Sequence, residues 1–293
     1  MTMPLLPVSD LEKLSPVFRG KAGNAILEGL RKLLGISQLS EIYDRISSFE
    51  GPDFASSLLD ELGIDFEIGG AERLESLPEG PFITISNHPY GGLDGIILLE
   101  LIGHRREGFR VMVNEFLSLI EPLRPSWIVV NPKNNDSNEV TGKNIQGVRE
   151  VLSNLKNGHP VGFFPSGAVS DFKLRNMRIE DREWQEPLLR LIRKAKVPIV
   201  PIRFFDGNSP FFYFLGLVNW KIRTLRLPRE LLNKGKARIR VGIGDVLSVA
   251  EQSSKARLKE FGMWLRNSVY GMRMPEKFEK YTLLAQKSDK MTF

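Results

Sequence analysis

From residue 66 onward, short apolar runs alternate with longer amphipathic segments. The apolar runs are bounded by glycine, proline and polar residues and predict strands over residues 82–86, 109–113, 127–130, 161–164, 199–204 and 237–243. Helices are expected over residues 96–102, 144–155 and 184–195. Strands that alternate with helices favour an α/β fold, with a mostly parallel central sheet flanked by helices.

Residues 1–65 lack this alternation and predict an N-terminal helical segment, with helices over 25–34, 39–49 and 54–62. The first of these combines an apolar face with the basic residues Arg31 and Lys32, a pattern suited to a membrane surface. A helix that packs on its own protein core would have the same pattern. We therefore expect a helical segment at 1–65 that docks on a membrane or on the core, an α/β domain at 66–275, and a frayed basic tail at 276–293.

A second unusual stretch covers residues 210–220, where aromatic and aliphatic side chains run directly into basic ones. Aromatic side chains beside cations are favoured at the interface between a bilayer and water. A buried core segment with a solvated basic flank is the alternative interpretation. The residues expected to contact a membrane are Phe211, Phe212, Trp220, Lys221 and Arg223.

Charge and composition narrow the choice of partners. The net charge is +6 and the pI is about 9.4, which favours anionic partners such as lipid headgroups or an acidic carrier protein. Nucleic acid is not expected, because the aromatic residues form one contiguous apolar run rather than alternating with cations. The N-terminus does not resemble a signal peptide, and no apolar run approaches the roughly 18 residues that span a bilayer. These features predict a peripheral protein at the cytoplasmic face of a membrane.

The candidate chemistry lies in the segment Ser86–Gly95, a glycine-bearing turn between a predicted strand and a predicted helix. It contains His88, one of three histidines in the chain, and Asp94. In open α/β sheets, ligands and catalytic groups gather at the carboxyl ends of strands. A carboxylate can orient a histidine that acts as a general base, although a structural histidine in a turn would have the same sequence. The chain has no cysteine, no nucleophile elbow, no phosphate-binding loop and no histidine spacing typical of a metal site. We expect no metal and no tightly bound cofactor.

Four segments, in this order, resemble the signature blocks of the glycerolipid (lysophospholipid) acyltransferase superfamily. Asn87-His88 followed by Asp94 resembles the first block, and 127–133 stands where the second belongs. Phe164-Pro165-Ser166-Gly167 resembles the third block, and 197–201 the fourth. The glycine-rich form of the first block is similar to the branch often labelled hemolysin-like acyltransferases.

This resemblance implies that His88 takes the proton of an acceptor hydroxyl, that Asp94 orients His88, and that the acceptor attacks an acyl thioester directly. The acyl donor would be acyl carrier protein (acyl-ACP) or acyl-coenzyme A (acyl-CoA). The matched blocks give the substrate-binding residues Asn131, Lys133, Phe164, Pro165, Ser166 and Gly167.

The chain departs from the family pattern in two respects. Five residues separate His88 from Asp94, one more than usual, and the flexible pair Gly91-Gly92 is expected to absorb the extra residue. Ser166 and Val169 replace a glutamate and an arginine that handle a glycerol-phosphate acceptor in the family, and Pro132 stands where an arginine is common. The missing guanidinium groups favour a lyso-lipid acceptor without phosphate, such as an N-acylated amino acid. The alternatives are a 1-acylglycerol-3-phosphate acyltransferase and a non-catalytic membrane-binding protein.

Overall fold

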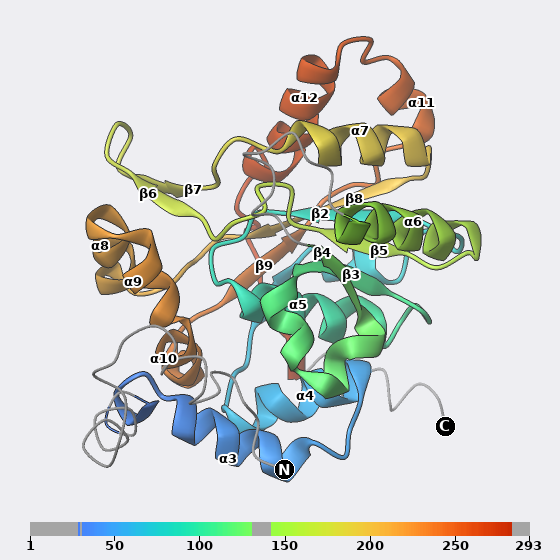
Figure 1. Cartoon of the computed structure of the whole chain (residues 1–293). Helices are drawn as coiled ribbons and strands as arrows, with labels where there is room; N and C mark the ends of the chain where they lie inside the picture. Colours follow the sequence, from blue (N-terminus) through green and yellow to red (C-terminus); the bar gives the residue numbers. More distant parts are fainter. Residues whose placement is uncertain (1–28, 30, 131–141, 283–293) are drawn as a thin grey trace.

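A sheet of eight strands organises the computed structural model, which describes residue 29 and residues 31–130 and 142–282 (Figure 1). Its strand order is β10-β1-β9-β8-β2-β5-β3-β4. The strands are β1 (Glu67–Gly69), β2 (Ile83–Ser86), β3 (Arg110–Asn114), β4 (Trp127–Val130), β5 (Val161–Phe163), β8 (Ile199–Phe204), β9 (Arg240–Ile243) and β10 (Glu279–Lys280). All neighbours are parallel except the pairs β8–β9 and β1–β10. The prediction of a mostly parallel α/β fold is confirmed.

The predicted strands agree closely with the observed ones in the centre of the sheet and less well at its edge. β4 and β8 have the predicted bounds, β2 and β5 differ from theirs by one residue at one end, and β3 lies one residue later than predicted. β9 begins at Arg240 rather than at residue 237, after the 3-10 turn η7 (Lys234–Lys236). The expectation of a frayed tail from residue 276 is wrong for residues 279–280, because they pair with β1 as β10.

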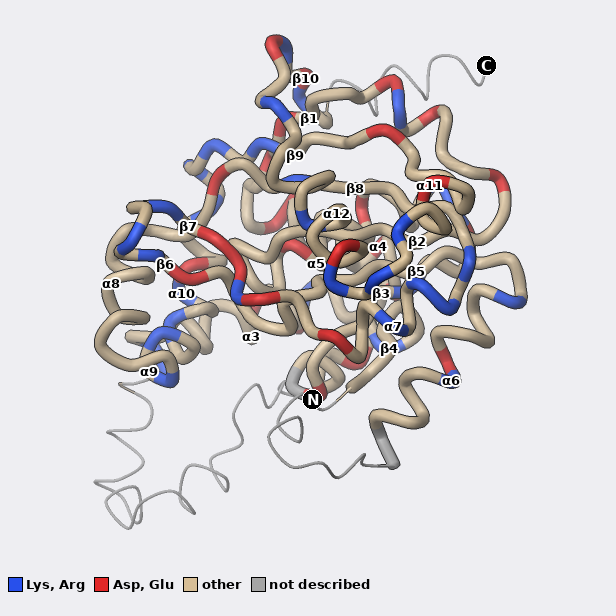
Figure 2. Tube along the Cα trace, turned by 90° about the horizontal axis from the view of Figure 1, so that it is seen from above, with Lys and Arg blue, Asp and Glu red and all other residues tan. Residues whose placement is uncertain are grey.

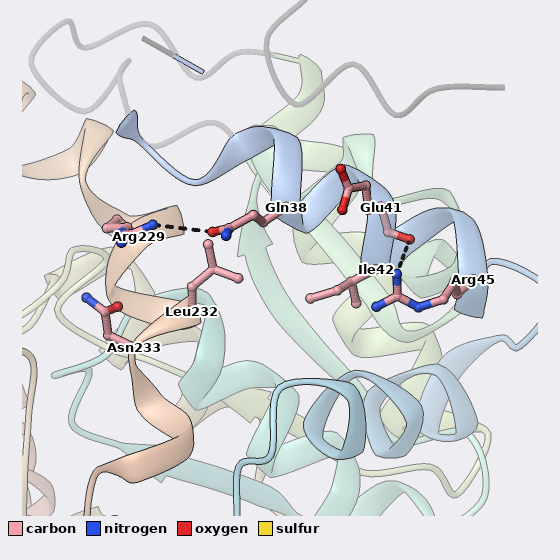
Figure 3. A pocket seen from close by; sticks show the side chains of 7 residues that line it. All are labelled: Gln38, Glu41, Ile42, Arg45, Arg229, Leu232 and Asn233. Atoms are coloured by element: carbon pink, nitrogen blue, oxygen red, sulfur yellow. Dashed lines mark hydrogen bonds between the residues drawn. The ribbon is translucent and has the colours of Figure 1, made fainter. Parts of the chain in front are cut away.

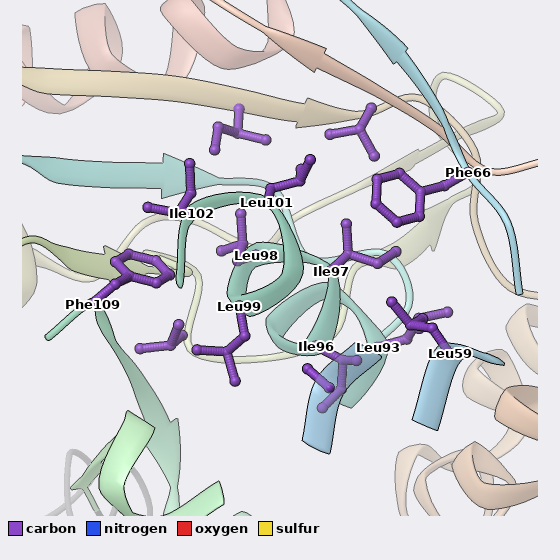
Figure 4. Close-up of a cluster of buried hydrophobic side chains, with 14 of the residues drawn as sticks. Leu59, Phe66, Leu93, Ile96, Ile97, Leu98, Leu99, Leu101, Ile102 and Phe109 are labelled. Carbon is purple, nitrogen blue, oxygen red and sulfur yellow. The ribbon is translucent and has the colours of Figure 1, made fainter. Parts of the chain in front are cut away.

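Helices cover both faces of the sheet, and each face has its own hydrophobic core. On one face lie α3 (Ile36–Ile46), α4 (Gly51–Glu61), α5 (Gly92–Leu98) and the π-helical turn η3 (Leu99–Gly103). Figure 4 shows the centre of this core around α5 and η3. On the other face, α6 (Gly142–Lys156), α7 (Glu186–Ala195) and α12 (Leu258–Tyr270) bury their apolar residues against β2, β4, β5 and β8. Because side chains alternate along a strand, Val200 and Ile202 of β8 enter the first core while Ile199 enters the second.

The N-terminal helices expected over 39–49 and 54–62 are present as α3 and α4. Ile42 and Ile46 of α3 and Phe54 of α4 belong to the same core as the sheet residues Val200 and Val241. Of the helix expected over 25–34, residue 29 and residues 31–34 are described, and residues 31–33 are helical. Its proposed contact with a membrane stays a prediction. The boundaries proposed at residues 65 and 275 stay predictions.

Several smaller elements lie beyond the carboxyl end of β8. They are the helices α8 (Pro210–Val218), α9 (Trp220–Leu225) and α10 (Leu227–Leu232). A separate hairpin, formed by β6 (Asp171–Lys173) and β7 (Arg178–Glu180), packs against α8. Figure 1 shows this hairpin beside α8 and α9 on one side of the molecule. The short helix α11 (Val249–Ser253) precedes α12. Within the described ranges, none of the helices has the length and apolar content needed to cross a bilayer.

Candidate active site

Two of the sequence motifs meet at the carboxyl ends of neighbouring strands. β2 lies between β5 and β8 and runs parallel to both. The turn with Asn87 and His88 follows β2, and the segment Phe164–Gly167 follows β5. The structure therefore brings the first and third motifs together at the edge of the sheet where ligands bind in open α/β folds.

His88 and Asp94 face each other at the centre of this site. Nδ1 of His88 lies 2.9 Å from Oδ2 of Asp94, and the exposed fraction is 17% for the His88 side chain and 0% for that of Asp94. Oδ2 of Asp94 also accepts hydrogen bonds from the backbone N–H groups of Tyr90 (2.9 Å) and Gly91 (3.0 Å). The carboxylate is thus held in place against the imidazole, and Nε2 of His88 is the ring atom left to exchange a proton with a substrate.

The turn between the two residues accommodates the extra residue through Gly91. Gly91 has φ 81° and ψ −129°, a region that side-chain-bearing residues rarely adopt. It immediately precedes α5, and Asp94 lies in the first turn of that helix. A carboxylate at this position is stabilised by the helix N-terminus. The predicted role of Gly91 in the longer turn is consistent with this backbone conformation.

Opposing effects act on the charge of Asp94. Complete burial raises the pKa of Asp94, because the carboxylate loses its hydration. His88 and the backbone N–H groups of Tyr90 and Gly91 counteract that rise, because they favour the ionised form. The charge on Asp94 therefore depends on these partners.

The third motif forms one wall of the site. The ring of Phe164 stacks on the ring of His88, with centroids 4.2 Å apart and an angle of 26° between the planes. The N–H of Gly167 donates to the carbonyl of Phe164 (2.9 Å), which closes a turn. Gly167 has φ 64°, a backbone conformation that favours glycine, and a Cβ there would displace the end of the Gln185 side chain. Ser166 is buried and donates its hydroxyl to the carbonyl of Ala168 (2.8 Å). Phe164 touches His88 directly, whereas the serine supports the turn.

Asp181, a buried carboxylate that was not predicted from the sequence, fixes the backbone of His88. Oδ1 of Asp181 accepts from the backbone N–H of His88 (3.1 Å) and from the hydroxyl of Ser170 (2.6 Å), and Oδ2 accepts from Nε1 of Trp184 (3.1 Å). The N–H of Ser170 donates in turn to the carbonyl of His88 (2.8 Å). Asp181 follows β7, 93 residues after His88, and no local pattern in the sequence indicates this contact.

We call residues 87–91 the catalytic turn because they include the candidate base His88. The other side of this turn is held by the last residue of β8 and by the segment that follows β8. The side chain of Asn87 pairs with the backbone of Phe204, accepting from its N–H and donating to its carbonyl, both at 2.8 Å. The carbonyl of Pro89 accepts from Nδ2 of Asn208 and from the hydroxyl of Tyr213, both at 3.1 Å. The sequence Ser209-Pro210 indicates the start of α8, but it could not have shown that this helix reaches the catalytic turn.

The other predicted contact residues have mixed outcomes. Asn131 and Lys133 lie outside the described residues. Phe211, Trp220 and Lys221 are exposed, and their membrane contact stays a prediction. Phe212 (1% exposed) and Arg223 (4% exposed) are buried inside the protein, so the prediction that their side chains contact a membrane is wrong. α8 is apolar around its circumference, so the sequence alone does not indicate that Phe212 faces the protein. Arg223, in α9, is buried in an ion pair with Asp171 (2.6 Å), a contact with a distant segment.

A separate pocket opens between α3 and α10 (Figure 3). Its lining residues are Gln38, Glu41, Ile42, Arg45, Arg229, Leu232 and Asn233. Arg229 donates from Nη1 to Oε1 of Gln38 (3.3 Å) across it. None of these residues belongs to the sequence motifs, so we assign the pocket no part in the chemistry at His88.

The site is thus a His/Asp pair at the carboxyl ends of parallel strands, held by backbone hydrogen bonds and walled by a glycine-bearing turn. Comparison with known families places the chain in a class. A family profile described as "Acyltransferase" matches residues 11–275. Because that match spans most of the chain, this protein belongs to this acyltransferase family.

Two curated relatives extend the comparison. The chain is 27% identical to a lyso-glycine lipid O-acyltransferase of Phocaeicola vulgatus over 256 residues, which cover 83% of this chain and 88% of the relative. It is also 27% identical to a lyso-glycine lipid O-acyltransferase of Bacteroides thetaiotaomicron over 195 residues, covering 66% of this chain and 67% of the relative. The inference from sequence that the chain is an acyltransferase is confirmed at the level of the family.

Proposed function

We propose that this protein transfers a fatty acyl group from an acyl thioester to the hydroxyl group of a lyso-aminolipid, and that its acceptor is a lyso-glycine lipid. The observation that carries the proposal is the 2.9 Å contact between Nδ1 of His88 and Oδ2 of Asp94. That contact fixes the orientation of an imidazole whose other nitrogen can accept a proton.

The proposed reaction uses His88 first as a base and then as an acid. Nε2 of His88 takes the proton of the acceptor hydroxyl while the hydroxyl oxygen attacks the thioester carbonyl carbon. A new C–O bond forms, the C–S bond breaks, and the thiolate leaves with the proton that His88 returns to it. Asp94 holds the imidazole and stabilises its protonated form. The products are a diacylated lipid and the free thiol of the carrier, so no acyl-enzyme is required.

Two independent observations support the choice of a lyso-glycine lipid as the acceptor. The relatives described above are named for lyso-glycine lipids. In this chain, Ser166 and Val169 stand where the wider superfamily carries an acid and a base for glycerol phosphate. A phosphate acceptor requires charge-assisted and preferably bidentate partners, and these positions provide none.

The donor and the location follow as parts of the same proposal. Acyl-ACP and acyl-CoA are both anionic thioesters, and the basic chain suits either of them. The acceptor and the product are lipids, so the enzyme would work as a peripheral protein at the cytoplasmic face of the membrane.

The test compares acceptors with the purified full-length protein. Lyso-glycine lipid or lysophosphatidic acid is supplied with long-chain acyl-ACP or acyl-CoA, and the diacylated product is measured by mass spectrometry. We expect turnover of the lyso-glycine lipid, and its loss by at least about 10²-fold in His88→Ala. His159→Ala is the matched control, because His159 lies outside the site and contacts the carbonyl of Glu107 (3.0 Å).

Three outcomes would contradict the proposal. Turnover of lysophosphatidic acid alone would indicate a phosphatidic-acid-forming enzyme. Full activity of His88→Ala would remove the proposed base. Absence of transfer to both acceptors from both donors, with vesicle binding retained, would indicate a non-catalytic membrane-binding protein.

A further inference from the structure

The outer sides of α8 and α9 carry a continuous group of exposed apolar side chains. Each is between 48% and 65% exposed: Phe211, Phe214, Leu217, Val218, Trp220, Ile222 and Leu225. Single exposed apolar residues are ordinary on protein surfaces, but seven on two consecutive short helices form the kind of patch that marks an interaction site.

The β6–β7 hairpin extends this patch. At and beside its turn, Leu174 is 65% exposed, Met177 is 70% exposed and Ile179 is 39% exposed. α8 packs against β6. Figure 1 and the view from above in Figure 2 both show the hairpin and the two helices on the same side of the molecule. We call the exposed apolar residues of α8, α9 and the β6–β7 hairpin the docking face.

Basic side chains accompany the docking face. Arg175 and Arg178 are exposed at the hairpin turn, and Lys221 is exposed in α9. Figure 2 shows Lys and Arg at both places. Nζ of Lys221 lies 5.8 Å from the centre of the Trp220 ring. The guanidinium of Arg226 lies 4.7 Å from the centre of the Phe211 ring. Aromatic rings beside cations are suited to the headgroup region of an anionic bilayer, whereas a purely apolar patch would suit a second protein chain equally well.

The inner side of the same helices is bound to the candidate active site. The hydroxyl of Tyr213 donates to the carbonyl of Pro89 in the catalytic turn (3.1 Å). Nη1 of Arg223 donates to the carbonyl of Ser170 (3.2 Å) and to Oδ1 of Asp171 (2.6 Å). Ser170 is hydrogen-bonded to the backbone of His88. The residues that hold the docking face therefore also contact the loops around His88.

From this arrangement we propose that the docking face inserts into the headgroup region of an anionic lipid bilayer and holds the catalytic turn next to it. Acceptor and product can then stay in the bilayer while the acceptor hydroxyl reaches His88. This inference rests on the proposed function for its purpose, but the docking itself requires neither donor nor acceptor.

The direct test is co-sedimentation of the full-length protein with vesicles of phosphatidylcholine and phosphatidylglycerol, without substrate. Two double variants probe the two parts of the face: Phe214→Ser with Leu217→Ser, and Leu174→Ser with Met177→Ser. Each should weaken binding by at least about tenfold, because two apolar side chains are lost from the interface. The matched control is Met263→Ser with Val246→Ser, which changes exposed apolar residues (51% and 39%) in α12 and in the loop after β9.

A second measurement locates the contact. Vesicles with brominated acyl chains should quench tryptophan fluorescence in the wild-type protein, and Trp220→Phe should remove most of the quenching. Trp127 and Trp184 are buried, and Trp264 is partly buried in α12 against the second core, so these three should contribute little.

Specific results would overturn the proposal. It fails if both double variants bind vesicles as the wild type does, or if the control loses as much binding. It also fails if the variants keep vesicle binding but lose self-association or binding to acyl carrier protein, since the face would then be a protein interface. His88→Ala should bind vesicles as the wild type does, because docking does not use the base. If the wild-type protein docks through this face but transfers no acyl group, only the proposed function is refuted.

Discussion

At the scale of single residues, the chemistry depends on how tightly Asp94 is held. Its carboxylate is buried and accepts two backbone hydrogen bonds in addition to its contact with His88. The backbone donors keep the carboxylate in place even when the imidazole changes its protonation state. Asp94 is therefore expected to control the orientation of the base more than the binding of either substrate.

We expect Asp94→Asn to lower kcat by about 10²–10⁴-fold with little change in KM, because the amide favours the wrong imidazole tautomer. Steady-state kinetics with the lyso-glycine lipid measure this, and thermal unfolding checks that the variant is folded. Residues that act as a unit are not additive. Adding Asp94→Asn to His88→Ala should thus cost little more, and full additivity of the two losses would argue against a dyad.

At the scale of elements, the turn from β2 into α5 sets the distance between base and carboxylate. Gly91 lies in the left-handed half of backbone space, and a Cβ there would lie 3.1 Å from Leu227 and 3.3 Å from Val169. Its neighbour Gly92 begins α5, and a Cβ there would meet only Leu117, at 3.7 Å. Gly92→Ala is therefore a suitable control for Gly91→Ala, because only Gly91 has a conformation that favours glycine.

Gly91→Ala should lower the free energy of unfolding by about 1–3 kcal/mol because of backbone strain, and it should also lower kcat because the His88–Asp94 contact shifts. Gly92→Ala should change both quantities only slightly. Urea unfolding and steady-state kinetics of both variants are the measurements. Equal effects at the two positions would mean that the conformation of Gly91 is unimportant for the turn.

A second contact between elements is sensitive to pH. His104, just after η3, lies 3.5 Å from Oε2 of Glu100, and its Nε2 lies 2.8 Å from the hydroxyl of Ser56 in α4. The hydrogen bond with Glu100 raises the pKa of His104 above its usual value. Burial alone would raise the pKa of Glu100, but its hydrogen bonds with His104 and Ser56 lower it below its usual value.

The protonated histidine stabilises the fold fully below its unfolded pKa of about 6.5, and this contribution is lost as pH rises through the raised folded pKa. The ionised Glu100 contributes above its unfolded pKa of about 4.3 and loses this effect on acidification. His104→Asn should therefore destabilise most between about pH 4.5 and 6.5, by about 1 kcal/mol or less for a partly exposed pair. Urea unfolding across pH, with His159→Asn as control, measures this, and a loss that grows above pH 7 would have the wrong sign.

At the scale of the whole molecule, local patterns determine the sheet well and the site only in part. β4 and β8 were predictable because contiguous apolar residues are bounded by turn residues, whereas β1 and β10 are too short and too polar for such a signal. The motifs at Asn87–Asp94 and Phe164–Gly167 could be located because each lies in a turn after a strand. Asp181, Asn208 and Tyr213 could not, because their contacts with the catalytic turn cross between distant segments.

Vesicle binding by the whole molecule should depend on ionic strength, because basic side chains accompany the apolar docking face. Each basic residue near an anionic bilayer contributes about 1 kcal/mol at low salt, and the screening length falls from about 10 Å at 0.1 M to about 3 Å at 1 M. Arg175, Arg178 and Lys221 together should therefore make vesicle binding weaker by about 10²-fold between low salt and 1 M salt. At low salt, the triple variant R175Q/R178Q/K221Q should bind anionic vesicles about as weakly as the wild type does in 1 M salt, and its binding should change much less with salt. Its binding to purely zwitterionic vesicles should match that of the wild type. Co-sedimentation over a salt series measures both proteins. If their salt dependences were the same, the cations that attract the membrane would have to lie elsewhere on the molecule.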